Sequence, residues 1–313
     1  TRQRPCRDGF FVYLYCTPHM LSLQDNLRSM TTPVITPFNS DKTLELEIFE
    51  SHLHTLINAG ISTLFPCGTT GEFASLSREE RVTLIDTAVD VAPSDISVIA
   101  GGAPSAVTSA REWVETIASL GVDAAVITAP QFHSSNDPMG IEHFFEAIAT
   151  DSPIPLLLYN IPACTGERIP PTTAVSLADH DSIIGLKDSG GDISYGLRIL
   201  DQTSSEFLVL QGYDPLLIPS LRMGFDGGVN ALSNVIPELY VEASRSPTSE
   251  RARTIHRGAI EPLFNMCRQD GFAPVVKAAL HARNQSYSAT VRPPLVEVTS
   301  AEISTMINRV RQL

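Results

Sequence analysis

The sequence predicts an α/β fold of the (β/α)8 (TIM) barrel type, followed by a C-terminal helical extension. From residue 31 onward, short runs of apolar and β-branched residues alternate with amphipathic stretches, as in parallel strand–helix units. Eight such units fit a closed barrel better than an open doubly wound sheet. The open alternative usually carries a G-x-G-x-x-G turn after its first strand, and none is found there.

The predicted strands are short, uncharged and rich in residues that favour buried sheets. In chain order they are Pro33–Thr36, Ser62–Phe65, Ser97–Ala100, Ala124–Thr128, Pro155–Tyr159, Ile183–Leu186, Phe207–Leu210 and Gly227–Val229.

The predicted helices between them carry apolar residues at a spacing of about 3.6. Ser77 and Glu80 form a capping-box signature at the start of one of these helices. The helical stretches are Glu45–Asn58, Arg78–Val91, Ser105–Leu120, Pro138–Ala149 and Asp192–Asp201.

We expect residues 30–246 to form the barrel and residues 247–313 a helical extension without catalytic residues of its own. The extension has helical segments near Ser249–Arg268, Pro274–Arg283 and Thr299–Arg311. Residues 1–29 lack clear periodicity, so we expect a non-native or disordered N-terminal extension, with Met30 as the natural start. A weak signal peptide is the alternative for this segment.

The composition argues against several classes of partner. There are 35 acidic and 22 basic residues, for a net charge of -13, and no basic patch suggests nucleic acid. No apolar run approaches the roughly 20 residues of a membrane span. The five scattered cysteines include no metal-binding pattern, so we expect reduced thiols and a cytoplasmic protein without a zinc site of cysteines. The acidic excess and the scarcity of lysine suggest a halophilic protein, with an ordinary acidic enzyme as the alternative.

Lys187 is the strongest candidate for a catalytic residue. It is one of three lysines, and it ends the apolar run Ser182–Leu186. Desolvation there would lower its pKa toward neutrality and leave an amine able to form a Schiff base, whereas a solvated lysine just past a strand is the alternative. Because active residues in such barrels sit at the carboxyl ends of strands, Lys187 and Tyr159 should approach each other within hydrogen-bond range. A phenol there could transfer protons at the reacting bond.

Two further segments are predicted to line the same mouth. The turn Gly68–Glu72 offers backbone N–H groups that could hold a carboxylate, while Glu72 could either brace the turn or touch substrate. Asp214 could bind a substrate hydroxyl or cap the next helix. His52 and His54, two positions apart on a helix, do not face one another as metal ligands would.

Gly-Thr-Thr-Gly-Glu72, Tyr159-Asn-Ile-Pro and Gly-Leu-Lys187-Asp-Ser occur in the order and spacing of the dihydrodipicolinate synthase/N-acetylneuraminate lyase family, which the chain resembles. The resemblance implies a class I aldolase-type barrel, a homotetramer, acting on pyruvate or 2-keto acids without metal or cofactor. It assigns the Schiff base to Lys187, proton transfer to Tyr159 and carboxylate binding to Thr69 and Thr70.

Departures from the family pattern bear on the substrate. Synthases of this family have an arginine where this chain has Cys164, and tyrosines near the position of Phe132. Cysteine cannot bind a carboxylate as a bidentate arginine does. The small residue at Cys164 and the stretch Gly227–Asn234 resemble archaeal 2-keto-3-deoxygluconate aldolases instead. The resemblance makes Ser189 and Asp214 contacts of sugar hydroxyls, and Gly212 completes the predicted substrate-binding set.

We therefore expect an aldolase that reversibly cleaves 2-keto-3-deoxygluconate, or a related 2-keto-3-deoxy sugar acid, to pyruvate and an aldehyde. The alternatives are a 4-hydroxy-tetrahydrodipicolinate synthase, which joins pyruvate to aspartate semialdehyde, and a sugar-acid dehydratase. A non-catalytic 2-keto-acid-binding regulator is the alternative from a different class.

Overall fold

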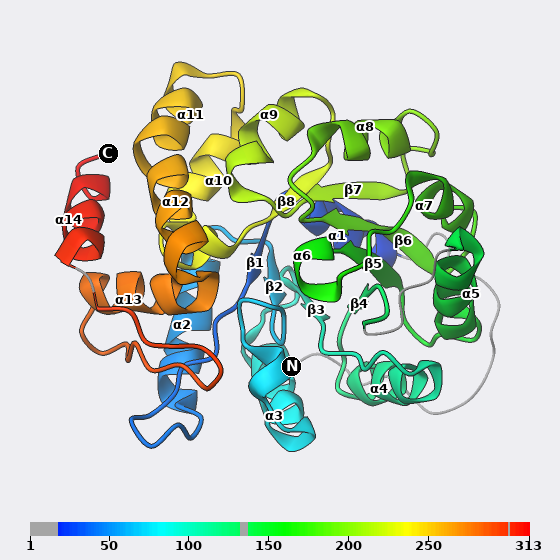
Figure 1. Cartoon of the computed structure of the whole chain (residues 1–313), viewed down its shortest axis with the longest axis horizontal. Helices are drawn as coiled ribbons and strands as arrows, with labels where there is room; N and C mark the ends of the chain where they lie inside the picture. The colour runs from blue at the N-terminus through cyan, green and yellow to red at the C-terminus, as the bar shows by residue number, and fades with distance from the viewer. Residues whose placement is uncertain (1–17, 132–136, 300) are drawn as a thin grey trace.

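The computed structural model describes residues 18–131, 137–299 and 301–313. Its eight strands pair in parallel and in chain order, and β1 closes the ring against β8. The predicted TIM barrel is therefore confirmed, and Figure 1 shows the strands at the centre of a ring of helices. The strands are β1 (Met30–Pro33), β2 (Thr63–Phe65), β3 (Ser97–Ala100), β4 (Ala124–Thr128), β5 (Leu156–Asn160), β6 (Ile183–Asp188), β7 (Leu208–Gln211) and β8 (Gly227–Val229).

The first strand begins three residues earlier than the sequence predicts. It covers Met30–Pro33, whereas the apolar pair after Pro33 suggested Pro33–Thr36. The N–H of Val34 still donates to Phe65 O of β2 (3.0 Å), but the N–H of Ile35 donates to the side chain of Asn234 (3.2 Å). The chain has thus left the sheet at Ile35. The side chains of Val34 and Ile35 pack in the core cluster that the barrel shares with its surrounding helices.

The surrounding helices follow the predicted pattern closely. Ser77 and Glu80 form the predicted capping box at the start of α3, with both reciprocal hydrogen bonds present. The helices of the ring are α2 (Leu46–Asn58), α3 (Arg78–Val91), α4 (Val107–Ser119), α5 (Pro138–Ala149), α6 (Pro162–Thr165), α7 (Pro171–Leu177), α8 (Ile193–Leu200), α9 (Leu217–Arg222) and α10 (Pro237–Arg245).

A helix that the sequence did not predict, α1 (Pro18–Leu27), packs against the end of the barrel where the strands begin. Leu23 and Leu27 are buried in the same apolar cluster as the side chains inside the barrel. Asn26 Nδ2 donates to Asp95 O and to Ser97 Oγ, both at 3.0 Å, beside the start of β3. In Figure 1, α1 lies behind the strands.

This helix changes the expected division at residue 29. Residues 18–27 pack as part of the barrel, because two leucines of α1 cover apolar side chains that would otherwise face water. Residues 1–17, where the rest of the expected extension falls, lie outside the described residues.

The C-terminal extension forms a group of helices on one side of the barrel, coloured orange to red in Figure 1. Its members are α11 (Glu250–Ile255), a π-helical turn (His256–Ile260), α12 (Glu261–Asp270), α13 (Phe272–Arg283) and α14 (Ala301–Val310). Val275, Val276 and Ala279 of α13 belong to the same core cluster as the ring helices, so the extension shares the barrel's core. Within the described residues, no helix combines the length and apolar character needed to cross a membrane.

Candidate active site

Lys187 and Tyr159 lie side by side at the carboxyl ends of β6 and β5. The strand register pairs them directly, and both are 4% exposed. Lys187 Nζ lies 4.0 Å from the centroid of the Tyr159 ring and 5.1 Å from that of Phe65. The amine is therefore held over aromatic faces inside the mouth of the barrel, where a carbonyl compound could reach it.

The contact between these two residues differs in kind from the expected hydrogen bond. Among the described residues, the hydroxyl of Tyr159 pairs with Thr69 Oγ1 at 3.4 Å, and the amine of Lys187 faces the ring instead. The hydroxyl thus points past the lysine toward the turn after β2. It can exchange a proton with a molecule bound between that turn and Lys187.

The turn Gly68–Glu72 is closed by its own backbone. Gly71 and Glu72 donate N–H bonds of 3.1 Å to Gly68 O and Thr69 O respectively. Thr36 Oγ1 donates to Gly71 O at 2.7 Å, and a Cβ on Gly71 would lie only 2.7 Å from Val34 O. The turn is consequently packed directly on the segment that follows β1.

The N–H groups of Thr69 and Thr70 differ from those of Gly71 and Glu72 in their hydrogen bonding. Within the described residues, neither takes part in a backbone or side-chain hydrogen bond. Two adjacent N–H groups without a partner, in a turn that follows a strand end, are of the kind that can bind an anion. Thr69 also lines a narrow cavity together with Phe65, Gly68, Thr128 and Tyr159.

Gly212 and Ser189 pack against the shaft of Lys187. A Cβ on Gly212 would lie 3.0 Å from Lys187 Cε and 3.0 Å from Asp188 O, and it would collide with Ser189 Oγ. The N–H of Gly212 donates to Asp188 O at 2.7 Å. The absence of a side chain at Gly212 therefore makes room for the lysine, and Ser189 lies at the same place.

Asp214 lies farther back than a substrate contact would. Its side chain is 1% exposed, and Oδ1 accepts bonds from Tyr240 Oη (2.5 Å) and from the N–H of Leu232 (3.1 Å). Burial raises the pKa of Asp214 to about 6, while these two hydrogen bonds oppose the rise. The sequence predicted either a contact to a substrate hydroxyl or a cap for the next helix. Within the described part of the chain, no side-chain hydrogen bond caps the 3₁₀ helix Asp214–Leu216, and the bonds from Tyr240 and Leu232 instead brace the loop after β7.

Asp188, next to the lysine, is bound to the neighbouring strand. Its Oδ1 accepts from Asn160 Nδ2 (2.6 Å) and from the N–H of Gly190 (3.0 Å). Burial raises the pKa of Asp188, and the bond from Asn160 opposes that rise. Asn160 Oδ1 in turn accepts from the N–H of Ile169 (3.1 Å), so β5, β6 and the segment before α7 are tied together below the mouth.

Cys164 and Phe132 are the two residues by which the sequence distinguished the substrate classes, and the structure describes only Cys164. Cys164 is exposed on α6. Burial of part of its side chain raises the pKa of the thiol, and the charge of Lys187 opposes that rise. Because α6 begins two residues after the end of β5, Cys164 lies at the mouth end of that strand. Phe132 lies outside the described residues.

His52 is a structural residue of α2. Asn234 Nδ2 donates to Pro33 O and Ala231 O, both at 2.9 Å, which makes Asn234 Oδ1 the acceptor for His52 Nε2 (2.9 Å). His52 Nδ1 then accepts from Tyr287 Oη (3.1 Å). Among the described residues there is no group of three or more His, Cys, Asp or Glu that could hold a metal ion.

Sequence reasoning missed Lys277 and its partner. Lys277 is fully buried and forms an ion pair with Glu72, the last residue of the Gly68–Glu72 turn. The scarcity of lysine that drew attention to Lys187 applies equally to Lys277, so the sequence could have marked Lys277 as a candidate too. Its partner could not be identified, because Glu72 precedes it by 205 positions.

Comparisons with known proteins agree with this geometry. The model of the dihydrodipicolinate synthetase family matches residues 26–313. The 4-hydroxy-tetrahydrodipicolinate synthase of Methanosphaerula palustris is 32% identical over 279 residues, covering 87% of this chain and 94% of the relative. That of Methanosarcina mazei is 33% identical over 285 residues, covering 90% and 96%.

Solved structures show the same similarity. A dihydrodipicolinate synthase from Bacillus anthracis is 28% identical, with a TM-score of 0.83 over 91% of this chain and 97% of that one. The chloride-inhibited dihydrodipicolinate synthase from Acinetobacter baumannii, complexed with pyruvate, is 26% identical, with a TM-score of 0.86 over 92% and 100%. These relatives carry the name of the synthase, and none of them is named as a 2-keto-3-deoxygluconate aldolase.

Proposed function

The chain belongs to the dihydrodipicolinate synthetase family and is thereby a pyruvate-dependent lyase of the aldolase type; we propose that Lys187 forms its Schiff base. The observation that supports this role is the position of Lys187 Nζ, 4.0 Å above the Tyr159 ring at the mouth of the barrel. The neutral amine attacks the C2 ketone of pyruvate, water leaves, and the protonated imine draws electrons from C3.

Tyr159 and the turn after β2 complete the proposed machinery. The N–H groups of Thr69 and Thr70 bind the carboxylate of the 2-keto acid, as backbone nests bind anions. The Tyr159 hydroxyl, 3.4 Å from Thr69 Oγ1, transfers the proton at the carbon–carbon bond that forms or breaks. Ser189 and Gly212, which pack beside the lysine, bound the space for the second reactant.

For the second reactant we propose aspartate semialdehyde, which makes the enzyme a 4-hydroxy-tetrahydrodipicolinate synthase. The support is that relatives sharing about a third of their residues along nearly their whole length carry that name. The enamine formed from pyruvate at Lys187 would attack the aldehyde carbon, and Tyr159 would protonate the resulting alkoxide.

One observation favours a second candidate, the cleavage of a 2-keto-3-deoxy sugar acid. Cys164, which is uncharged, lies beside the mouth. By the family resemblance, the synthases have an arginine at this position. A thiol offers no bidentate ion pair to a second carboxylate, whereas a polyol does not need one. Asp214 gives no comparable support, because Tyr240 and Leu232 already occupy its Oδ1.

Borohydride trapping tests whether Lys187 forms a Schiff base. A panel of substrates tests which of the proposed reactions the enzyme catalyses. Purified protein reduced in the presence of pyruvate should carry the reduced adduct on the peptide that contains Lys187, and Lys187→Ala should carry none. An unlabelled Lys187 would overturn the mechanism. Consumption of pyruvate with aspartate semialdehyde identifies the synthase, aldehyde release from 2-keto-3-deoxy sugar acids identifies the aldolase, and loss of water without aldehyde release identifies a dehydratase.

We also propose a cytoplasmic homotetramer adapted to high salt. The support is the family membership and the net charge of -13 with three lysines in the chain. Sedimentation equilibrium of the purified protein tests the tetramer. Unfolding midpoints measured from low to molar salt test the adaptation, since a midpoint that does not rise with salt would count against it.

A further inference from the structure

Glu72 and Lys277 form an ion pair that is sealed from solvent behind the mouth of the barrel. Both side chains are 0% exposed. Lys277 Nζ donates to Glu72 Oε1 and, at 2.8 Å, to Thr290 O. The pair joins α13 in the C-terminal extension to the turn that follows β2.

The second oxygen of Glu72 is bound by the same extension. Glu72 Oε2 accepts the backbone N–H of Arg292 at 3.0 Å. Both carboxylate oxygens are therefore held by residues beyond position 270. Because the Glu72 side chain is 0% exposed and each of its oxygens already accepts a bond, this arrangement favours bracing the turn over touching substrate, the two roles that the sequence allowed for it.

The backbone of Glu72 has a conformation that this attachment helps to maintain. Its φ is 56°, in the left-handed region that residues other than glycine rarely adopt. In this conformation its N–H reaches back to Thr69 O (3.1 Å) and closes the turn. The fixed carboxylate thus holds the last residue of a turn whose second and third residues carry the free N–H groups.

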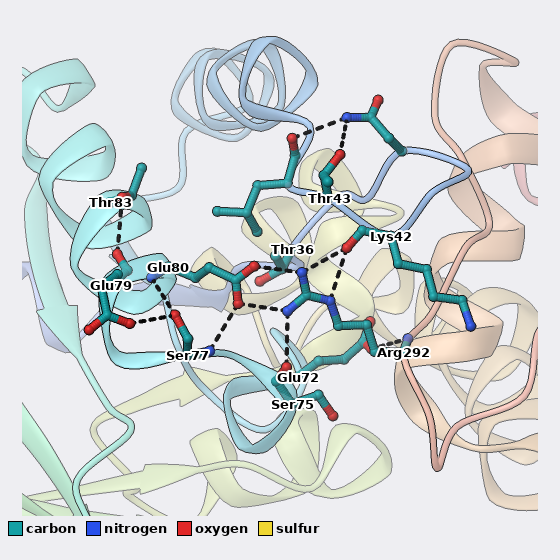
Figure 2. Close-up of polar contacts among 12 residues, drawn as sticks. Thr36, Lys42, Thr43, Glu72, Ser75, Ser77, Glu79, Glu80, Thr83 and Arg292 are labelled. Atoms are coloured by element: carbon teal, nitrogen blue, oxygen red, sulfur yellow. Dashed lines mark hydrogen bonds and ion pairs between the residues drawn. The ribbon is translucent and has the colours of Figure 1, made fainter.

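Arg292 fastens the neighbouring part of the same loop. Its guanidinium donates to Glu80, to Ser75 O (3.0 Å) and to Lys42 O, as Figure 2 shows. Both cations lie against the ring of Phe38, with Lys277 Nζ 4.1 Å and the Arg292 guanidinium carbon 4.5 Å from its centroid. The extension consequently holds Glu72 and the part of the loop that follows it, up to Glu80.

A contribution to stability alone is a weak explanation for this pair. Removing two charges from water costs several kcal/mol per ion, and apolar side chains of similar size often serve stability equally well. Burial lowers the pKa of Lys277 to about 8, and Glu72 opposes this decrease. A charged pair does supply fixed directions, because each of its bonds has a defined geometry.

We propose that Glu72 and Lys277 are positioning residues: they hold the Gly68–Glu72 turn so that the N–H groups of Thr69 and Thr70 point at the carboxylate of the 2-keto acid. The proposal rests on the proposed function, since it presumes that this turn binds pyruvate. It gives the C-terminal extension a part in substrate binding, although none of its residues touches the substrate.

The test measures how much pyruvate is needed to trap Lys187 with borohydride. The principal variant is Glu72→Gln/Lys277→Met, which leaves no buried charge and so avoids the unfolding expected of a lone buried carboxylate. We expect the half-saturating pyruvate concentration to rise about tenfold, as when one N–H bond to a carboxylate is lost. The fraction of Lys187 labelled at saturation should stay near that of the wild type. Lys277→Met, measured well below its unfolding temperature, should behave likewise.

The matched control is Glu242→Gln/Arg251→Met, which removes a two-bond ion pair on the surface of α10 and α11. Its half-saturating concentration should equal that of the wild type. If the Glu72 and Lys277 variants also bind pyruvate as the wild type does, and differ only in unfolding temperature, the pair is a structural brace and the proposal is wrong. If wild-type protein is not labelled at all, the proposed function fails first, and the positioning role fails with it.

Discussion

Glu80 and Arg292 form an ion pair with two parallel hydrogen bonds, each 2.6 Å long, between the first turn of α3 and the loop after α13. Glu80 also accepts the N–H of Ser77 (2.9 Å) as part of the capping box. One carboxylate therefore starts a helix of the ring and binds the C-terminal extension to it.

Substitution of Glu80 should separate these two contributions. Glu80→Gln can keep the capping box, which accepts glutamine, but loses the charge that faces Arg292. We expect the free energy of unfolding to fall by about 1–2 kcal/mol in Glu80→Gln, and by about 1 kcal/mol more in Glu80→Ala, which lacks the cap as well. Urea unfolding at neutral pH measures both, and equal losses in the two variants would contradict the assignment.

The same pair predicts a dependence on pH. The hydrogen bond from Arg292 is the main cause that lowers the pKa of Glu80 below its ordinary value of 4.5. A lowered carboxyl pKa stabilises the folded state above the unfolded pKa, and this stability is lost as the pH falls through the folded value. The difference between wild type and Glu80→Gln should hence be constant above about pH 5 and shrink below it.

Gly212→Ala should impair imine formation. The added methyl group would lie 3.0 Å from Lys187 Cε and from Asp188 O, so the lysine must move from its place over the Tyr159 ring. We expect the rate of borohydride-trapped labelling to fall by at least about tenfold, because small displacements of a reacting group are costly. Ser189→Ala/Gly212→Ala removes one of the colliding atoms and should recover part of the rate. Wild-type labelling in Gly212→Ala would show that the glycine is dispensable.

His52 should make folding sensitive to mild acid. Burial lowers the pKa of His52 to about 4 from its ordinary value of 6.5. The unfolded chain binds a proton in this range that the folded chain does not, so stability falls as the pH drops from about 6.5 toward 4. The full contribution is about 3 kcal/mol. The difference in unfolding free energy between wild type and His52→Gln should shrink over this window.

Other groups titrate in the same pH range, and therefore the effect of His52 must be measured as the difference in unfolding free energy between wild type and His52→Gln. Asp214, with its pKa raised to about 6, binds its proton more readily when folded and shifts stability in the opposite direction. Its contribution is shared by wild type and His52→Gln and cancels in their difference. A difference that does not change between pH 7 and about 4.5 would mean that His52 protonates in the folded state.

Cys164→Arg should discriminate between the proposed second reactants. An arginine beside the mouth could form a bidentate ion pair with the carboxylate of aspartate semialdehyde. If that compound is the substrate, we expect kcat/KM for it to rise about tenfold or more, while the trapping of Lys187 by pyruvate alone stays unchanged. Cys164→Ser is the control of similar size. A loss of sugar-acid cleavage in Cys164→Arg, without any gain for the semialdehyde, would favour the aldolase.

The parts of the fold that local pattern determines were predicted well. Ala124–Thr128 and Arg78–Val91 have the predicted bounds, because burial of an uncharged strand and a capping box act through neighbouring residues. The prediction was wrong at β1, where Pro33–Thr36 was expected and the strand covers Met30–Pro33, with Thr31 and Thr32 buried in it. Their burial depends on strands far away in the sequence, which no local pattern reports.

The sequence predicted those parts of the candidate site that depend on one residue at the end of each strand. Lys187 and Tyr159 are register partners on adjacent strands, as the order of the strands implied. Asp214 looked equally suited to binding a substrate hydroxyl and to capping the next helix, and its actual partner Tyr240 was not foreseen because it lies 26 positions away on another helix. The attachment of Glu72 to Lys277 was invisible for the same physical reason: side-chain pairing is set by packing of the whole chain.

The position of α1 determines the route by which reactants meet. Leu23 and Leu27 fill the barrel at the end where its strands begin, so within the described part of the chain Lys187 is approached from the opposite end. Entry and exit then share one passage. Under the proposed mechanism the 2-keto acid would bind before its reaction partner, and a partner that entered first would obstruct Lys187. An excess of the second reactant should accordingly slow turnover, with the 2-keto acid relieving the inhibition.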